Sequence, residues 1–241
     1  MPEYPLKEQA AVVTGASQGV GRAVAWRLAQ LGANVLCAAR SLPRLQELTA
    51  EIQRAGGVAR ACRCDVRSEA EVQAMAQAAL SAWGRIDILV NNAGVGQFGT
   101  PLYETTPEIW AATMETNLRS VYYALRAVAP GMIQRRSGHI INIASLAAHN
   151  PLPGGAAYAA SKAAMHALSV SAAEELRGHG VRVSLICPGS IDTDLSTELV
   201  GNKDRGKMLR PEDVAHTVEM LVTQAGNSFV SEIQMRPTRK P

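Results

Sequence analysis

AAVVTGASQGVG, which runs from Ala10 to Gly21, places a short apolar segment directly before a turn with three glycines. The apolar residues are typical of a buried strand, and the residues after the turn repeat apolar side chains at helical spacing. Glycine lets the backbone approach a ligand closely, and the amides at the start of a helix attract an anion. Gly15, Gly19 and Gly21 therefore predict either a phosphate-binding turn or a tight structural turn without a ligand.

The same order of apolar run and amphipathic segment repeats along the rest of the chain. Helical periodicity covers 20–33, 42–56, 69–83, 107–135, 156–168 and 211–221, and short apolar runs occupy 34–39, 58–63, 86–91, 139–144, 182–187 and 230–235. Apolar strands separated by amphipathic helices indicate a parallel sheet covered on both faces. No linker or repeat interrupts the series. Residues 1–241 are therefore expected to form one α/β domain around a doubly wound parallel sheet of about seven strands.

The composition is that of an ordinary globular protein. Of the 241 residues, 47% are hydrophobic and 19% are charged, and the net charge is +3. So small an excess of basic residues, without a dense basic run, does not favour nucleic acid as a partner. The first residues, MPEYPLKEQ, lack the layout of a signal peptide, and no stretch is apolar enough for a membrane span. The sequence predicts a cytoplasmic protein with neither nucleic-acid nor membrane partners.

The four cysteines do not have the spacing of a metal site. They are Cys37, Cys62, Cys64 and Cys187. A single residue separates Cys62 from Cys64, and no histidine pair accompanies them. We interpret all four as small buried hydrophobic residues and expect no metal.

The end of the second expected strand indicates which dinucleotide the glycine turn would hold. In dinucleotide-binding folds an acidic residue there accepts a hydrogen bond from the ribose 2′-hydroxyl, whereas an arginine accommodates a 2′-phosphate. The sequence CAARS offers Ala38 and Ala39, without a carboxylate, and then Arg40. A guanidinium binds a phosphate through two N–H donors, so the pattern favours NADP(H) over NAD(H), unless Arg40 is only a solvated charge.

A second chemical pattern lies in AAYAASKAAMHAL, Ala156 to Leu168, where Tyr158 and Lys162 stand four positions apart among alanines. Alanine favours a helix, and residues at i and i+4 share one helix face. The phenol and the ammonium are therefore expected to lie one above the other. Taken alone, such a pair is more often an ordinary helix with a surface tyrosine.

Four stretches together resemble the short-chain dehydrogenase/reductase family: TGASQGVG, NNAG at Asn91–Gly94, Ser145 after INIA, and YAASK. They occur in the family's order over nearly the whole chain. The resemblance implies a Rossmann-like fold and an NADP(H)-dependent enzyme that transfers a hydride between nicotinamide and a carbonyl or secondary alcohol. It also implies a homodimer or homotetramer, formed through the alanine-rich helix and the helix before it. A noncatalytic NADP(H)-binding sensor or scaffold is the alternative.

The resemblance implies contacts with the cofactor at several turns. Asp65 and Val66 are similar to the pair beside the adenine, and Ile191 and Thr193 to residues that hold the nicotinamide carboxamide. NADP-using relatives often carry a basic residue where this chain has Gln18, which leaves the preference to Arg40, with Arg44 as a further candidate. The full implied set is Gly15, Ser17, Gln18, Gly19, Val20, Gly21, Arg40, Asp65, Val66, Asn91, Ala93, Gly94, Tyr158, Lys162, Pro188, Gly189, Ile191 and Thr193.

The implied catalytic residues are Asn117, Ser145, Tyr158 and Lys162. The resemblance implies that Tyr158 exchanges a proton with the substrate oxygen and that Ser145 donates a hydrogen bond to that oxygen. Lys162 hydrogen-bonds with the nicotinamide ribose, and Asn117 connects it to a chain of waters, unless Asn117 is a plain exposed polar residue. A free phenol has a pKa of about 10, so work near neutral pH requires about 4 kcal/mol of phenolate stabilisation. A neighbouring ammonium would supply it.

The segment LAAHNPLPGGAA after Ser145 is expected to line the substrate pocket with Leu146, His149 and Leu152, unless His149 is an exposed loop residue. Nothing in the sequence names the substrate among ketones, aldehydes, 3-oxoacyl groups and 3-hydroxy acids. The chain ends EIQMRPTRKP, without the Gly-Gly that many relatives carry near the last strand. This ending resembles a subgroup of NADP-dependent reductases and hydroxy-acid dehydrogenases.

Overall fold

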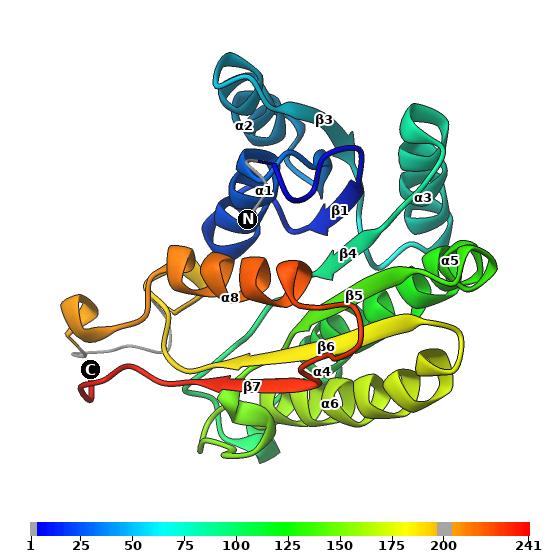
Figure 1. The fold of residues 1–241 in the computed structure, drawn as a ribbon. Coiled ribbons are helices and arrows are strands. Elements are labelled where there is room, and N and C mark those ends of the chain that lie inside the picture. The colour runs from blue at the N-terminus through cyan, green and yellow to red at the C-terminus, as the bar shows by residue number, and fades with distance from the viewer. Residues whose placement is uncertain (1–3, 197–203) are drawn as a thin grey trace.

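The computed structural model describes residues 4–196 and 204–241. The described strands form one sheet of seven, in the order β3-β2-β1-β4-β5-β6-β7, and all neighbours are parallel (Figure 1). This confirms the doubly wound sheet and the number of strands that the apolar runs predict. The strands are β1 (Ala10–Thr14), β2 (Asn34–Ala39), β3 (Val58–Arg63), β4 (Ile88–Asn91), β5 (Gly138–Ile143), β6 (Val181–Pro188) and β7 (Glu232–Met235).

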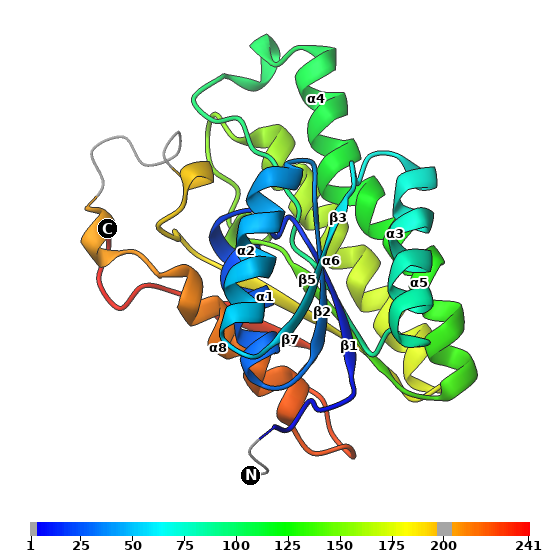
Figure 2. The same cartoon turned by 90° about the horizontal axis from the view of Figure 1, so that it is seen from above.

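Helices cover both faces of the sheet (Figure 2). One face carries α1 (Gly19–Gln30), α2 (Leu42–Arg54) and α8 (Pro211–Thr223). The other carries α3 (Glu69–Trp83), α5 (Ser120–Arg135) and α6 (Ala156–Arg177). Successive strand residues point to opposite faces, so Val12 and Val13 of β1 enter different core clusters, and both are fully buried. Each such valine stabilises the fold by roughly 1.5–3 kcal/mol.

The segment 107–135 departs from its prediction as one continuous helix. It consists of α4 (Pro107–Met114), a π-helical turn η2 (Glu115–Arg119) and α5. The wider turn makes room for Asn117, which is fully buried and has its hydrogen-bond partners outside the helix. π-turns inside α-helices often mark functional sites. The prediction was therefore wrong in the middle of this segment, at a residue implied to be catalytic.

Three short 3₁₀ turns lie outside the sheet layers. They are η1 (Leu102–Glu104), η3 (Leu146–Ala148) and η4 (Arg205–Lys207). Within the described ranges, no helix combines the length and the apolar character needed to cross a lipid bilayer. The sheet order reverses between β1 and β4, and ligands of such sheets bind beyond the carboxyl ends of the strands at this position.

Candidate active site

The turn between β1 and α1 leaves its backbone open to a ligand. Gly15 has φ +66°, a left-handed conformation, and a Cβ there would lie 2.9 Å from the Ala93 Cα. A Cβ at Gly21 would collide with the Gly15 carbonyl oxygen. The first turn of α1 holds no acidic residue, and in the described structure the Gln18 side chain does not cap it. Its amides are therefore available to an anion, as a phosphate-binding turn requires.

Thr14 joins this turn to the segment that follows β4. Its Oγ1 accepts hydrogen bonds from the backbone N–H groups of Asn92 at 3.0 Å and Ala93 at 3.1 Å. In return, Asn92 Nδ2 donates to the Thr14 carbonyl at 3.0 Å. Asn91 points elsewhere: it is buried, and its Nδ2 donates to Asn142 Oδ1 at 2.8 Å. Asn91 therefore links β4 to β5, whereas Asn92 and Ala93 bind Thr14 at the glycine turn.

A cavity of about 650 Å³ opens at these strand ends. Many of the predicted cofactor residues line it, namely Gly15, Ser17, Gln18, Gly19, Arg40, Asp65, Val66, Ala93, Gly94 and Thr193. An adjoining cavity of about 500 Å³ is lined by Tyr158, Gly189 and Ile191, and Thr193 borders both. Among the described residues, Val20, Gly21, Asn91, Lys162 and Pro188 line neither cavity. The structure thus brings most of the predicted cofactor residues together around the two cavities. The other five do not reach the cavity walls.

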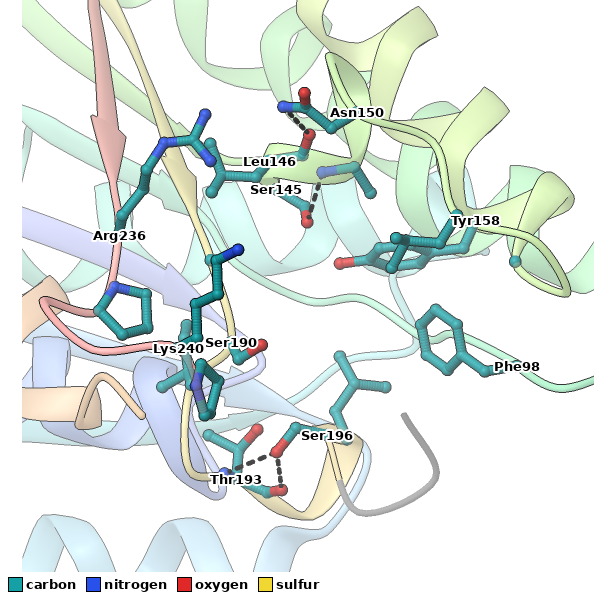
Figure 3. Close-up of a pocket in the computed structure, with 18 of the residues that line it drawn as sticks. Phe98, Ser145, Leu146, Asn150, Tyr158, Ser190, Thr193, Ser196, Arg236 and Lys240 are labelled. Atoms are coloured by element: carbon teal, nitrogen blue, oxygen red, sulfur yellow. Dashed lines mark hydrogen bonds between the residues drawn. The ribbon is translucent and has the colours of Figure 1, made fainter. Parts of the chain in front are cut away.

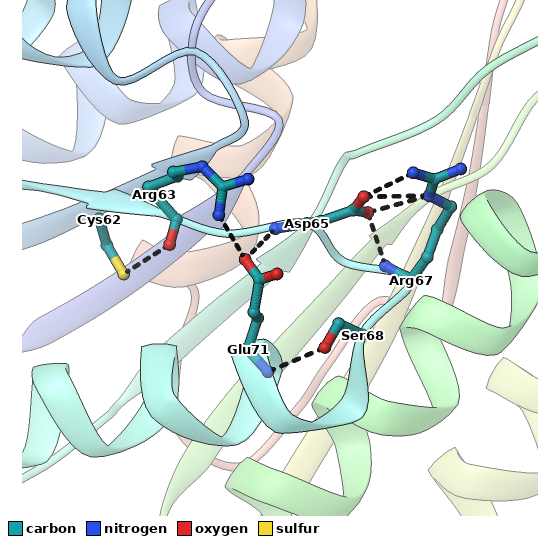
Figure 4. A network of polar contacts seen from close by, with 6 residues as sticks. All are labelled: Cys62, Arg63, Asp65, Arg67, Ser68 and Glu71. Atoms are coloured by element: carbon teal, nitrogen blue, oxygen red, sulfur yellow. Dashed lines mark hydrogen bonds and ion pairs between the residues drawn. The ribbon is translucent and has the colours of Figure 1, made fainter.

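One end of the larger cavity is basic. Arg40, Arg44 and Arg67 all line it, and Arg44 Nη1 donates a hydrogen bond to Gln18 Oε1. Asp65 is paired with Arg67, whose Nη2 lies 2.6 Å from Oδ2 (Figure 4). The hydrogen bonds from Arg67, with Arg40 nearby, lower the pKa of Asp65 to about 2. Three guanidinium groups against one neutralised carboxylate suit a phosphate at this end. Sequence reasoning missed Arg67, although it follows directly on Asp65 and Val66.

A small polar network holds this loop against α3. Glu71 Oε2 accepts from the backbone N–H of Asp65 at 3.0 Å and from Arg63 Nη1 at 3.1 Å. Ser68 caps the helix, because its Oγ accepts from the Glu71 backbone N–H at 3.3 Å (Figure 4). The network positions the loop backbone that borders the cavity.

Ser145 and Tyr158 meet in the smaller cavity (Figure 3). Ser145 caps η3, with its Oγ accepting from the Ala147 backbone N–H at 3.1 Å. Tyr158 lies in the first turn of α6, and its phenol oxygen points toward the Ser145 hydroxyl (Figure 3). The Phe98 ring packs edge-on against the phenol at 5.1 Å between ring centres. The structure thus places two hydroxyl groups in one pocket, beside the Phe98 ring.

Lys162 lies on the same face of α6 as Tyr158, one turn further along. Its side chain is buried, with Nζ 5.7 Å from the centre of the phenol ring. Burial lowers the pKa of Lys162 to about 8. Burial also raises the pKa of Tyr158, and the neighbouring Ser145 hydroxyl offsets part of that effect. This direction is opposite to the lowering that the sequence argument requires, because desolvation of the phenolate is the largest influence on its pKa. The phenol is therefore held in its proton-donating form.

Asn117 fastens the segment after β4 to α6. Its Oδ1 accepts from the backbone N–H of Val95, and its Nδ2 donates to the Val95 carbonyl, each at 2.8 Å. The same Nδ2 lies 2.9 Å from Ser161 Oγ, which donates to the Tyr158 carbonyl at 2.7 Å. Asn117 therefore positions both the cavity edge and the start of α6. Asn117 thus has a structural role in joining two segments, and it is buried rather than exposed.

The smaller cavity has an apolar wall and a basic rim. Leu146 and Leu152, which the sequence predicts at a substrate pocket, line this cavity. His149 does not, and its Nε2 lies 2.8 Å from Glu232 Oε1. Sequence reasoning missed Phe98 and the C-terminal tail, whose Arg236, Arg239 and Lys240 border the same cavity (Figure 3). Only the fold could place that tail beside Ser145.

Comparisons with known proteins agree with this geometry. The chain is 37% identical to an uncharacterized oxidoreductase of Staphylococcus saprophyticus over 96% of its own length and 98% of the relative. It is 35% identical to the NADP-dependent 3-hydroxy acid dehydrogenase YdfG of Escherichia coli K12, with 94% of each chain covered.

Solved structures show the same fold. A metagenomic short-chain oxidoreductase in complex with NADP matches with a TM-score of 0.87 and 47% identity, covering 98% of this chain and 100% of the other. An alcohol dehydrogenase from Thermococcus sibiricus, complexed with 5-hydroxy-NADP, matches with a TM-score of 0.89 and 29% identity over 97% and 98% of the two chains. The family model of short chain dehydrogenases matches residues 9–204. This chain belongs to the short chain dehydrogenase family and is an oxidoreductase of that kind.

Proposed function

We propose that this protein interconverts a carbonyl compound and a secondary alcohol with NADP(H), and that Tyr158 is its general acid and base. The observation that carries the proposal is the meeting of Ser145 and Tyr158 in one cavity that adjoins the glycine-turn cavity. A hydroxyl pair beside a dinucleotide cradle is what carbonyl reduction needs, since one group must donate a proton to the oxygen that receives negative charge.

The cradle fits a dinucleotide in shape and charge. The backbone of Gly15 and Gly19 and the first-turn amides of α1 would hold the pyrophosphate. Arg40 and Arg44 border the cavity where a 2′-phosphate requires cations, which supports NADP(H) over NAD(H). Once bound, the nicotinamide supplies or accepts the hydride. The Escherichia coli relative is NADP-dependent and the Thermococcus structure holds 5-hydroxy-NADP, and both support the same assignment.

The proton chemistry is assigned to residues of α6 and η3. In the reduction direction, Tyr158 donates its phenolic proton to the substrate oxygen, and the Ser145 hydroxyl donates a hydrogen bond to the same atom. The raised pKa of Tyr158 keeps the proton in place until the substrate oxygen becomes basic. Lys162 holds a positive charge 5.7 Å from the ring centre, which attracts the phenolate as it forms. Asn117 holds the surrounding segments in register.

Among the substrate classes left open by the sequence, we favour those with an acidic group. Arg236, Arg239 and Lys240 place three cationic side chains on the rim of the cavity that holds Tyr158. Phe98, Leu152 and Leu195 supply an apolar wall for a short carbon chain. A carboxylate at the rim and a carbonyl near Ser145 would satisfy both features. The name of the Escherichia coli relative, a 3-hydroxy acid dehydrogenase, agrees with this class.

A homodimer or homotetramer belongs to the same proposal. Three large side chains stand exposed on the helices expected to pair: Trp110 of α4 at 41%, Tyr122 of α5 at 45% and Val170 of α6 at 50%. Burying such residues against a second copy stabilises an assembly. Sedimentation equilibrium gives the assembly mass, and a monomer at micromolar concentration would contradict this part.

The experiment that tests the function is a paired screen that follows nicotinamide absorbance. Oxo acids, 3-hydroxy acids, their methyl esters, neutral ketones and aldehydes are each assayed with NADP(H) and with NAD(H). The proposal predicts turnover with NADPH or NADP⁺, faster for the free acid than for its ester. Turnover that is equal for acid and ester would contradict the acidic-substrate class. Binding of NADPH without turnover of any pair would favour a noncatalytic sensor.

A further inference from the structure

Four side chains that take no part in the proposed reaction gather behind Ser145. His149 follows η3, His166 lies on α6 one turn beyond Lys162, Cys187 is in β6, and Glu232 begins β7. None of the four lines either of the two cavities described above. The elements α6, β6 and β7 lie side by side at one edge of the sheet (Figure 1). We refer to these four residues as the His–Cys–Glu cluster.

Three potential metal ligands in this cluster converge on one point. His149 Nε2 lies 2.8 Å from Glu232 Oε1, and Cys187 Sγ lies 3.9 Å from each of these two atoms. The donor atoms of all three residues lie within 4.8 Å of one another. His166 Nε2 is 3.0 Å from Glu232 Oε2, the second oxygen of the same carboxylate. The histidine rings pack edge-on, with 4.8 Å between their centres.

These spacings are close to those of a tetrahedral zinc site. Zn²⁺ bonds to cysteine sulfur at about 2.3 Å and to histidine nitrogen or carboxylate oxygen at about 2.0–2.2 Å, which sets tetrahedral donor atoms about 3.4–3.6 Å apart. The observed triangle has edges of 2.8, 3.9 and 3.9 Å. Side-chain adjustments of roughly half an ångström would bring the observed donor–donor distances to those of a tetrahedral zinc site. Thiolate, imidazole and carboxylate are all ligands that Zn²⁺ accepts.

The surroundings of the cluster also suit a metal. A hydrogen bond orients one of the ligands from outside, because His166 Nε2 lies 3.0 Å from the second oxygen of the Glu232 carboxylate. Cys187 is fully buried, whereas the side chains of His149 and Glu232 are 29% and 30% exposed. An ion can therefore enter from the histidine side and reach the buried sulfur.

We propose that His149, Cys187 and Glu232 bind one Zn²⁺ ion, with His166 orienting the Glu232 carboxylate and water completing the tetrahedron. Binding displaces the thiol proton to solvent and leaves the oxidation state of the metal unchanged. The ion joins η3, β6 and β7, three elements that are far apart in the chain. None of its three ligands lines the substrate cavity, so its role is to fix these elements and not to polarise the substrate.

The test uses Co²⁺ as a spectroscopic probe on the full chain after removal of metals with EDTA. Tetrahedral Co²⁺ bound to a thiolate gives visible d–d bands and a near-ultraviolet charge-transfer band. The proposal predicts saturation at one equivalent per chain, loss of the charge-transfer band in Cys187→Ser, and displacement of Co²⁺ by Zn²⁺. Because His166 acts through the carboxylate, His166→Gln weakens binding by about 10–100-fold without removing that band.

Two matched variants control for adventitious binding. Cys62→Ser removes a half-buried thiol on β3, and His179→Gln removes an exposed histidine after α6; both retain full binding. Circular dichroism of each metal-free variant shows whether it is folded. If Cys187→Ser does not fold, Glu232→Gln serves as the second ligand variant. The absence of saturable binding would overturn the proposal. So would a spectrum that is unchanged by Cys187→Ser or lacks the charge-transfer band in the wild type. The readout is independent of the proposed catalytic function.

Discussion

Lys162 Nζ donates a 2.9 Å hydrogen bond to the carbonyl of Ile143, the last residue of β5. An ammonium has three N–H donors, so this bond fixes its position and leaves two donors for the space beside Gly94. A Cβ on Gly94 would lie 3.7 Å from Nζ and 3.3 Å from Asn117 Oδ1, so only a glycine leaves that space open without crowding. The charge is thus anchored to the sheet beneath the Tyr158 ring.

The burial of Lys162 predicts a pH dependence of stability. Its pKa of about 8 in the folded protein is below the 10.5 of an exposed lysine, so the unfolded chain binds more protons between these values. Stability therefore rises with pH across this window, and the full penalty, on the order of 3 kcal/mol, applies below pH 8. Lys162→Met has no ammonium group, so it lacks this pH-dependent contribution to the free energy of unfolding. Urea denaturation at intervals from pH 7 to 10 should show a slope that the variant loses; parallel curves would contradict the assignment.

Asn117→Ala should destabilise the protein and weaken cofactor binding together. The substitution leaves the half-buried N–H and C=O of Val95, and the buried Ser161 hydroxyl, without the amide that now pairs with them. At roughly 0.5–1.5 kcal/mol for each of the three lost hydrogen bonds, the free energy of unfolding falls by about 1.5–4.5 kcal/mol. Urea denaturation and NADPH fluorescence titration measure the two effects. Asn227→Ala, at an exposed residue before β7, is the control, and an equal effect there would argue against a special role of Asn117.

Arg40→Ala should weaken the binding of NADPH much more than the binding of NADH. Loss of a charge-assisted pair with the 2′-phosphate costs roughly 1.5–3 kcal/mol, which raises the dissociation constant of NADPH by about 10–100-fold. NADH has no such phosphate, so its affinity should change by less than about threefold. Titration with both dinucleotides measures this difference. Arg54→Ala, an exposed arginine on α2, provides the control. Equal losses for NADPH and NADH would exclude Arg40 as the phosphate ligand.

Two glycine variants test the turn after β1. Gly21→Ala forces a methyl group against the Gly15 carbonyl, so the turn must open at a cost of about 1–3 kcal/mol, and NADPH affinity falls with it. At Gly178 nothing lies within 4 Å of a Cβ and φ is −61°, so Gly178→Ala should be neutral or slightly stabilising. Thermal unfolding with and without NADPH compares them. Equal behaviour of the two variants would show that the turn is not the anion site.

Most of the fold can be predicted from the sequence, because buried parallel strands require continuous apolar runs. The run 34–39 coincides with β2, and the run 86–91 begins two residues before β4 (Ile88–Asn91) because Asp87 turns its carboxylate to the backbone N–H of Ala10. The π-turn at Glu115–Arg119 could not be predicted in this way. Helical periodicity does not reveal that Asn117 pairs with Val95, a residue of the loop after β4.

The sequence indicates candidate site residues where they follow one another closely in the chain, as in the glycine turn and the Tyr158–Lys162 pair. Contacts between distant segments escaped prediction. Arg236 and Lys240 reach the cavity only because β7 ends beside β6. Cysteine spacing alone excluded a metal, yet Cys187, His149 and Glu232 converge from different elements. Likewise, helix spacing placed the Lys162 charge near Tyr158 but could not show that burial would dominate the pKa of the phenol.

The central claim is that the Tyr158 phenol carries the proton between protein and substrate. The most direct measurement is single-turnover hydride transfer by Tyr158→Phe, with NADPH affinity determined on the same sample. The ring and its contact with Phe98 are retained, so NADPH binding should change by less than about threefold, while the rate falls by at least about 10²-fold. A variant that reduces the carbonyl at the wild-type rate would contradict the account.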